Sequence, residues 1–214
     1  MDFNLSPEQV QIREQIGRVC REFPDDYWRA LDRKKDYPEA FVRKLTELGW
    51  LAALIPEEYG GTGLGISEGS IILEEINRSG GNATACHAQM YTMGTLLPHG
   101  SEAQKKRYLP KIAGGELRLQ AFAVTEPNAG SDTTRIETMA TKRGNKYVIE
   151  GEKVFISRVF ESDLMLLLAR TSRYQELDDK TKGLSVFLLD LRDAKNTIEV
   201  KPLDLMINHH SNAV

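Results

Sequence analysis

The sequence predicts an α+β protein of more than one domain, in which an N-terminal helical bundle precedes a mostly antiparallel β-barrel or sandwich. Up to about residue 117, apolar residues recur at helical spacing between capping signals and glycines. From about residue 119, short apolar or alternating runs follow, separated by turn material such as "KRGNK" and "RDAKN". Because no long helical pattern separates these runs, the strands should pair mostly antiparallel. We place the two domains at residues 1–118 and 119–214.

Helix-start signals are clearest at two points of the first domain. "LSPEQVQIREQ" has Ser6 at the N-cap, Pro7 at the first helical position and Gln9 to complete a capping box. A second capping box, Ser101 with Gln104, begins "SEAQKKRYLPKIAGGE". Three further helices are predicted for "YPEAFVRKLTELGW", "SEGSIILEEINRSGG" and "NATACHAQMYTMGTLLPHG". The last is small or apolar all round, as in a helix buried between others.

Strands are predicted for five segments of the second domain. They are "RLQAFAVTE", "YVIEGEKVFIS", "DLMLLLAR", "LSVFLLDL" and "TIEVKPL". The segment "YQELDDKTKG" is interpreted as an exposed loop.

Composition excludes several classes of partner. The 214 residues are 41% hydrophobic and carry a formal net charge of −3, with lysine and arginine scattered along the chain, so neither nucleic acid nor a membrane surface is expected to bind. No apolar run is long enough to span a bilayer. Cys20 and Cys86 form no metal-ligand spacing or disulfide framework. Without a visible targeting signal, we expect a cytoplasmic protein, or one of the mitochondrial matrix.

Several motifs are better explained by structure than by chemistry. The glycines of "EEYGGTGLG" do not have the spacing of a dinucleotide fingerprint, so a tight interhelical turn is preferred to a phosphate loop. His209 and His210 would project to opposite sides of a strand, and no metal site is expected. No nucleophile elbow indicates a hydrolase.

Two segments of the second domain have a composition that favours a ligand. In "AFAVTEPNAGSD" and in "GEKVFIS", a strand brings a hydroxyl, Thr125 or Ser157, close to an aromatic ring, Phe122 or Phe155. A planar heteroaromatic ligand packs on such rings while hydroxyls and backbone N–H groups bond its edge. The small residues of "NAGSD" can present N–H groups to phosphate oxygens. The alternative is that these are ordinary strand residues, since aromatics and hydroxyls are common there.

Motifs along the whole chain resemble those of the acyl-CoA dehydrogenase family. They are "ELGWLAALIPEEYGGTGLG", "LEEINRSGG", "HGSEAQKKRYLPKIAGGE", "FAVTEPNAGSD", "GEKVFIS" and "KPLDLMINHHSNAV", in the family's order. The resemblance implies an N-terminal helical domain, a middle β-domain and a third domain of helices. It also implies α,β-dehydrogenation of an acyl-CoA thioester with FAD as cofactor and electron-transfer flavoprotein as redox partner.

The resemblance assigns site residues position by position. Cofactor contacts are implied for Phe122, Val124, Thr125, Gly130, Ser131, Phe155, Ile156 and Ser157. Of these, Val124 and Thr125 would lie at the isoalloxazine ring and Ser157 near flavin N5, while Phe155 would cover the flavin face where tryptophan is usual. Ser131 would reach the phosphate region shared by FAD and acyl-CoA. Met90, Tyr91 and Met93 would line the acyl chain, although a role as simple core residues competes.

The chain departs from the family pattern in two ways. Arg158 and Val159 replace an Asn-Gly turn after "KVFIS", and since Val159 tolerates a positive φ badly, we expect this turn to be rebuilt or the flavin edge to be placed differently. The sequence also stops where the family adds a further strand and the third domain. The resemblance places the catalytic glutamate in that domain, so we identify no catalytic residue, do not assign Glu126 as the base and expect the isolated chain to be inactive.

Alternatives to the dehydrogenase remain open at this stage. The chain could be a non-catalytic binding or scaffold subunit that pairs with a full-length relative through the face left by the missing helices. An oxidase of the same superfamily, such as an acyl-CoA oxidase or nitroalkane oxidase, would carry the same loop motif. The full-length protein is expected to be a homo-oligomer, either a tetramer or a dimer.

Overall fold

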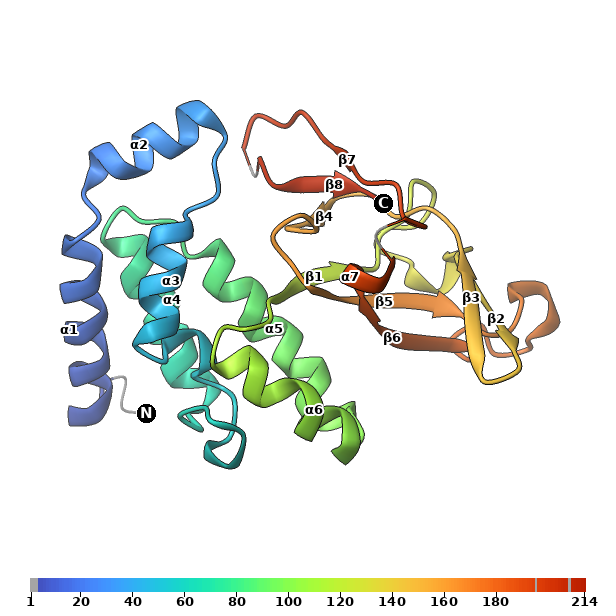
Figure 1. Cartoon of the computed structure of the whole chain (residues 1–214), viewed down its shortest axis with the longest axis horizontal. Coiled ribbons are helices and arrows are strands. Elements are labelled where there is room, and N and C mark those ends of the chain that lie inside the picture. Colours follow the sequence, from blue (N-terminus) through green and yellow to red (C-terminus); the bar gives the residue numbers. More distant parts are fainter. Residues whose placement is uncertain (1–3, 195, 208) are drawn as a thin grey trace. The chain divides into compact units, whose positions relative to one another are not determined.

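The computed structural model describes residues 4–194, 196–207 and 209–214 (Figure 1). The chain forms two compact units, the first extending to Arg118 and the second beginning at Leu119. Helices build the first unit and strands dominate the second, which confirms the predicted fold class. Within the described ranges, no helix combines the length and apolar character needed to cross a membrane.

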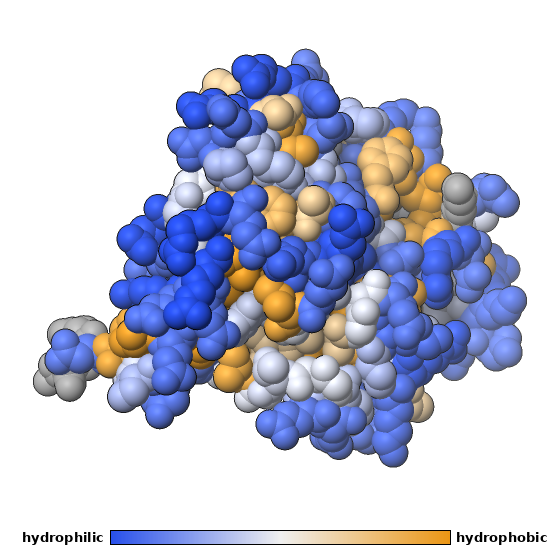
Figure 2. Space-filling view, turned by 60° about the vertical axis from the view of Figure 1, so that its left-hand side comes forward, coloured by the Kyte–Doolittle hydropathy of each residue, from blue (hydrophilic) through white to orange (hydrophobic). Residues whose placement is uncertain are grey.

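Among the described residues, the first unit contains the five helices that the sequence predicts and a further one, Asp25–Lys34, that was not predicted. The α-helices are α1 (Pro7–Arg21), α2 (Asp25–Lys34), α3 (Glu39–Glu47), α4 (Ile66–Arg78), α5 (Thr84–His99) and α6 (Glu102–Ala113). Short 3₁₀ helices span Trp50–Ala52 and Glu57–Tyr59. Apolar faces of these helices meet in one core that includes Ile16, Leu45 and Ile72, each fully buried. Hydrophilic residues cover most of the face seen in Figure 2, with apolar residues in smaller groups between them.

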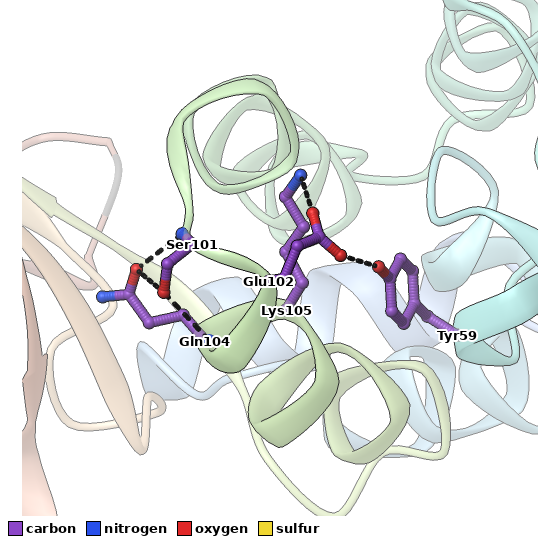
Figure 3. Close-up of polar contacts among 5 residues, drawn as sticks. All are labelled: Tyr59, Ser101, Glu102, Gln104 and Lys105. Carbon is purple, nitrogen blue, oxygen red and sulfur yellow. Dashed lines mark hydrogen bonds and ion pairs between the residues drawn. The ribbon is translucent and has the colours of Figure 1, made fainter.

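Both predicted capping boxes are confirmed. Ser6 Oγ accepts a hydrogen bond from the N–H of Gln9, and the side chain of Gln9 accepts one from the N–H of Ser6. Figure 3 shows the same arrangement for Ser101 and Gln104 at the start of α6. Beside it, Glu102 accepts hydrogen bonds from Lys105 Nζ and from a tyrosine hydroxyl of the second 3₁₀ helix, at 3.0 and 3.1 Å. Local side-chain bonds therefore define both helix starts.

The glycine-rich segment is an interhelical turn, as predicted. It connects the 3₁₀ helix Glu57–Tyr59 to α4, and both Gly60 and Gly63 adopt positive φ angles, of 84° and 64°. Gly61 faces a different constraint, because a Cβ atom there would lie 1.9 Å from the carbonyl oxygen of Ile55. Only glycine permits this approach of the two backbone segments.

The second unit contains two separate sheets. The larger consists of β1 (Leu119–Ala123), β5 (Leu164–Arg170), β2 (Met139–Arg143) and β3 (Lys146–Glu150) in that order, and β6 (Leu184–Asp190) also pairs with β5. The smaller has the order β4 (Ile156–Ser157), β8 (Ser211–Ala213) and β7 (Lys201–Pro202). Most pairings are antiparallel, as expected, but β1 and β2 both run parallel to β5.

Several details of the β-domain differ from the prediction. The predicted strand "YVIEGEKVFIS" is divided between β3 and β4, with residues 151–155 outside any strand. The sheets do not close into a barrel among the described residues. Strand β2 was not predicted, because its sequence "MATKR" is mostly polar and its strand conformation depends on pairing with β3. His209 and His210 lie in a turn before β8 and not within a strand, and His210 Nδ1 lies 2.9 Å from Glu161 Oε1.

We predict that Gly61→Ala lowers the free energy of unfolding of the first unit by about 1–3 kcal/mol, because the new methyl group must push two backbone segments apart. The matched control is Gly94→Ala, an exposed position inside α5 where a Cβ meets nothing within 4 Å. It should stabilise the unit by about 0.5–1 kcal/mol. Urea unfolding followed by fluorescence of Trp28 and Trp50 measures both. Equal effects of the two substitutions would contradict this account of the turn.

Candidate functional site

The first ligand-favouring segment leaves the sheet directly after β1. Its chain reverses at Pro127 and Asn128, where the N–H of Glu126 donates to the carbonyl of Ala129 at 2.9 Å and the N–H of Ala129 donates back at 3.2 Å. Strand β1 itself is held against β5 in the buried part of the larger sheet. The segment therefore starts from a fixed position and ends in a closed turn.

The second segment is bonded directly to the first. The N–H of Val154 donates to the carbonyl of Thr125 at 2.9 Å. The Nζ atom of Lys153 donates to the carbonyl of Val124, also at 2.9 Å. The sequence predicted that these two segments act together, and the structure brings them into contact.

A buried ion pair underlies this contact. Lys153 Nζ lies 2.9 Å from Glu126 Oε1, and the two residues are only 1% and 4% exposed. Backbone N–H groups complete the carboxylate, with Thr138 donating to Oε1 at 2.9 Å and Glu137 donating to Oε2 at 2.6 Å. Each charge is thus matched by a partner in an interior where an unpaired charge is costly.

These contacts shift the ionisation of both groups. Burial alone would raise the pKa of Glu126, but the N–H donors of Glu137 and Thr138 and the Lys153 ammonium together hold that pKa below its ordinary value. Burial lowers the pKa of Lys153, and Glu126 opposes this shift. Glu126 is charged and fully bonded, so it is not available to accept a proton from a substrate.

Residues 155–157 differ in exposure, with Phe155 directly before β4 and the other two within it. Phe155 is 60% exposed and has a φ of 59°, an uncommon conformation for a bulky residue, while Ile156 is buried. Ser157 is partly buried and pairs with Ser211 of β8. The side-chain amide of Asn212 donates to the carbonyl of Ile156 at 3.1 Å, which secures the strand from the β8 side.

The turn after β4 avoids a positive φ at Val159. The positive φ falls on Arg158, at 58°, and not on Val159, which is buried in the apolar core of the unit. The N–H of Arg158 donates to the carbonyl of His210 at 2.7 Å. A β-branched residue is thereby kept out of the left-handed conformation.

The groups that remain open suit a phosphate-bearing planar ligand. Within the described residues, no acceptor is assigned to the N–H groups of Gly130 and Ser131 or to the hydroxyls of Thr125 and Ser157. Gly130 is exposed, and a Cβ atom there would meet nothing within 4 Å. Together with the exposed ring of Phe155, these donors have the chemistry that a flavin nucleotide requires: N–H groups for phosphate oxygens, hydroxyls for a ring edge and an apolar face.

The remaining predicted residues are placed as follows. Phe122 and Val124 are partly buried at the end of β1, and Ser131 is exposed beyond the turn. Met90, Tyr91 and Met93 lie in α5 of the first unit. Both methionines are buried, and Met90 belongs to the helical core, which favours the simple packing role for it.

Sequence reasoning missed Lys153, although a signal for it exists. The signal is its place in the strand-like segment "GEKVFIS", since a lysine that becomes buried there needs an acidic partner. The acid, Glu126, lies in the other ligand-favouring segment. In the part of the chain that the structure describes, no group of histidine, cysteine, aspartate and glutamate side chains could hold a metal ion.

Two family models match the chain. Residues 6–116 match the acyl-CoA dehydrogenase N-terminal domain, and residues 121–212 match the acyl-CoA dehydrogenase middle domain. The chain is 34% identical over 221 residues to a glutaryl-CoA dehydrogenase of Desulfococcus multivorans, covering 99% of the chain and 54% of that protein. It is 32% identical to the mitochondrial isovaleryl-CoA dehydrogenase of Pongo abelii, covering 87% of the chain and 44% of the relative. The chain thus spans about half the length of these relatives.

Solved structures resemble both units over the whole chain. A glutaryl-coenzyme A dehydrogenase in complex with glutaryl-CoA superposes with a TM-score of 0.86 at 30% identity, covering 100% of this chain and 54% of that one. The FAD complex of PigA gives a TM-score of 0.84 at 26% identity, with coverage of 100% and 56%. A structure of the electron transferring flavoprotein of Acidaminococcus fermentans gives 0.84 at 28%, with coverage of 100% and 55%.

We predict that Glu126→Gln makes the stability of the second unit less dependent on acidic pH. Because the pKa of Glu126 is lower in the folded chain, the unfolded chain takes up the proton first as the pH falls. The stability due to the charged carboxylate is fully present above the unfolded pKa of about 4.3 and is lost as the pH falls through the folded pKa.

Urea unfolding followed by far-ultraviolet circular dichroism, at pH values from about 3 to about 7 on either side of the carboxyl pKa, measures this dependence. The matched control is Glu152→Gln, an exposed carboxylate next to the ion pair. Its pH dependence should follow that of the unaltered chain. Parallel curves for the unaltered chain and Glu126→Gln would show that the buried carboxylate does not contribute as described.

Proposed function

Since the chain belongs to the acyl-CoA dehydrogenase family, we propose that it supplies the flavin-binding part of an enzyme that dehydrogenates an acyl-CoA thioester between its α and β carbons. One observation carries this proposal. Two segments far apart in the sequence are bonded together by Lys153, and they leave open the N–H groups, hydroxyls and aromatic ring that a flavin nucleotide needs. The PigA likeness supports FAD as that nucleotide, and the likeness to glutaryl-CoA and isovaleryl-CoA dehydrogenases supports the substrate class.

The residues of this chain take separate parts in binding. With FAD bound, the exposed ring of Phe155 would cover the face of the isoalloxazine ring, and the hydroxyls of Thr125 and Ser157 would bond its polar edge. The N–H groups of Gly130 and Ser131, which bond no other group of the described chain, would bond phosphate oxygens. Bound FAD supplies a hydride acceptor, which amino-acid side chains lack.

Proton removal from the α carbon requires a carboxylate other than those near this loop. Glu126 is enclosed by Lys153 and two backbone N–H groups. Asp132 accepts hydrogen bonds from Thr134 and Arg135 and holds its own turn. We therefore propose that these residues hold FAD and that neither Glu126 nor Asp132 is the base that removes the α proton.

Electron-transfer flavoprotein is the proposed acceptor of electrons from the reduced flavin. Membership of the acyl-CoA dehydrogenase family is what implies this partner class. An oxidase would instead pass the electrons to dioxygen. For a dehydrogenase, we expect the reduced flavin to be reoxidised slowly in air and quickly by electron-transfer flavoprotein.

We predict that Ser157→Ala weakens FAD binding about 5- to 10-fold, the loss expected when one hydrogen bond worth about 1–1.4 kcal/mol is removed. Titration of flavin fluorescence with the purified chain measures the dissociation constant. Ser185→Ala is the matched control, because Ser185 is also a partly buried strand serine of the second unit. It should leave the constant unchanged. Absence of saturable FAD binding by the unaltered chain would contradict the proposed function.

A further inference from the structure

We propose that Lys153 and Glu126 are positioning residues for the flavin and that their opposite charges balance each other beside it, so that neither alone sets its reduction potential. This inference rests on the proposed function, because it concerns the same site. It goes further because it assigns to two buried residues, neither of which is proposed to contact the flavin, an effect on the flavin reduction potential.

Lys153 fixes the direction of the peptide that precedes Thr125. Its Nζ atom donates to the carbonyl of Val124, on the inner side of the loop. In a trans peptide the C=O and N–H groups point in opposite directions, so the N–H of Thr125 is directed away from Lys153. Within the described residues that N–H has no assigned acceptor. Lys153 thereby presents the Thr125 N–H to a ligand.

The next peptide is fixed as well. The carbonyl of Thr125 accepts a hydrogen bond from the N–H of Val154, and the N–H of Glu126 donates to Ala129. Glu126 in turn holds Lys153 in place and binds two backbone N–H groups of the following segment. Both peptides around Thr125 are thus oriented by bonds that use no ligand atom, so the site is formed in advance of binding.

The charges of the pair lie in an interior that screens them weakly. Both side chains are almost completely buried, so each acts on its surroundings more strongly than a surface charge would. A positive charge near a flavin favours its reduced, more negative form, and a negative charge opposes it. With both residues present the net charge is zero. Removal of either one leaves a charge of known sign next to Thr125.

A purely structural pair would behave differently. Removing either partner would loosen the loop and weaken FAD binding, but a looser loop has no reason to move the reduction potential in opposite directions for the two substitutions. The sign of the potential shift therefore separates the electrostatic role from packing alone.

The experiment uses the 214-residue chain loaded with FAD, at about pH 6, because burial lowers the pKa of Lys153 and an acidic pH favours its protonated form. Lys153→Met should lower the flavin reduction potential and Glu126→Gln should raise it, each with FAD binding weaker by about tenfold. The double variant K153M/E126Q should return the potential to that of the unaltered chain. Lys153→Arg keeps the charge and should keep the potential, and Lys146→Met, an exposed lysine of β3, should change neither quantity.

Each other outcome overturns the inference in a distinguishable way. Potentials that are unchanged, or that shift in the same direction for both single variants, would overturn it while FAD binding by the unaltered chain leaves the proposed function standing. Failure of the unaltered chain to bind FAD would overturn both. If Lys153→Met does not fold, the comparison of Glu126→Gln with the double variant and with Lys153→Arg still gives the sign.

Discussion

The arrangement of the second unit depends on the buried contact between Lys153 and Glu126. This pair joins two segments that are 27 residues apart in the sequence and that share no strand pairing. Through Lys153 it also fixes the carbonyl of Val124, and through Glu126 it binds the backbone that leads into β2. A buried ion pair is not in itself a source of stability, since desolvation opposes the attraction. Its effect here is to select one loop conformation, and the open donor groups follow from that conformation.

The backbone on either side of β4 accommodates large side chains at positions of positive φ. Phe155 and Arg158 adopt left-handed conformations on either side of the strand, while the intervening residues keep their pairing with β8. Such conformations cost of order 1–3 kcal/mol each and persist when neighbouring contacts determine them. Asn212 bonds the carbonyl of Ile156, and the carbonyl of His210 receives the N–H of Arg158. These contacts fix the backbone that follows Phe155, whose side chain is exposed.

The features that could be predicted from the sequence are those that depend on residues close together in the chain. The helix starts at Ser6 and Ser101 depend on bonds three residues apart, so a short motif contains them. The two ligand-favouring segments could also be recognised, because the hydroxyl and aromatic residues of each lie within a few positions of one another. In contrast, β2 becomes a strand through its partner β3, and the parallel pairing of β1 with β5 joins residues about 45 positions apart. Glu126, the partner of Lys153, is 27 residues away in the sequence, so no local pattern identifies it either.

We propose that the segments around Thr125 and Ser157 form one flavin site. Amide hydrogen exchange of the chain with and without FAD, resolved by residue through NMR, can detect such a site. We expect the N–H groups of Thr125, Gly130 and Ser131 to become protected together with those of β4, while the exposed hairpin of β2 and β3 is unaffected. Protection confined to other parts of the second unit, with these amides unchanged, would contradict it.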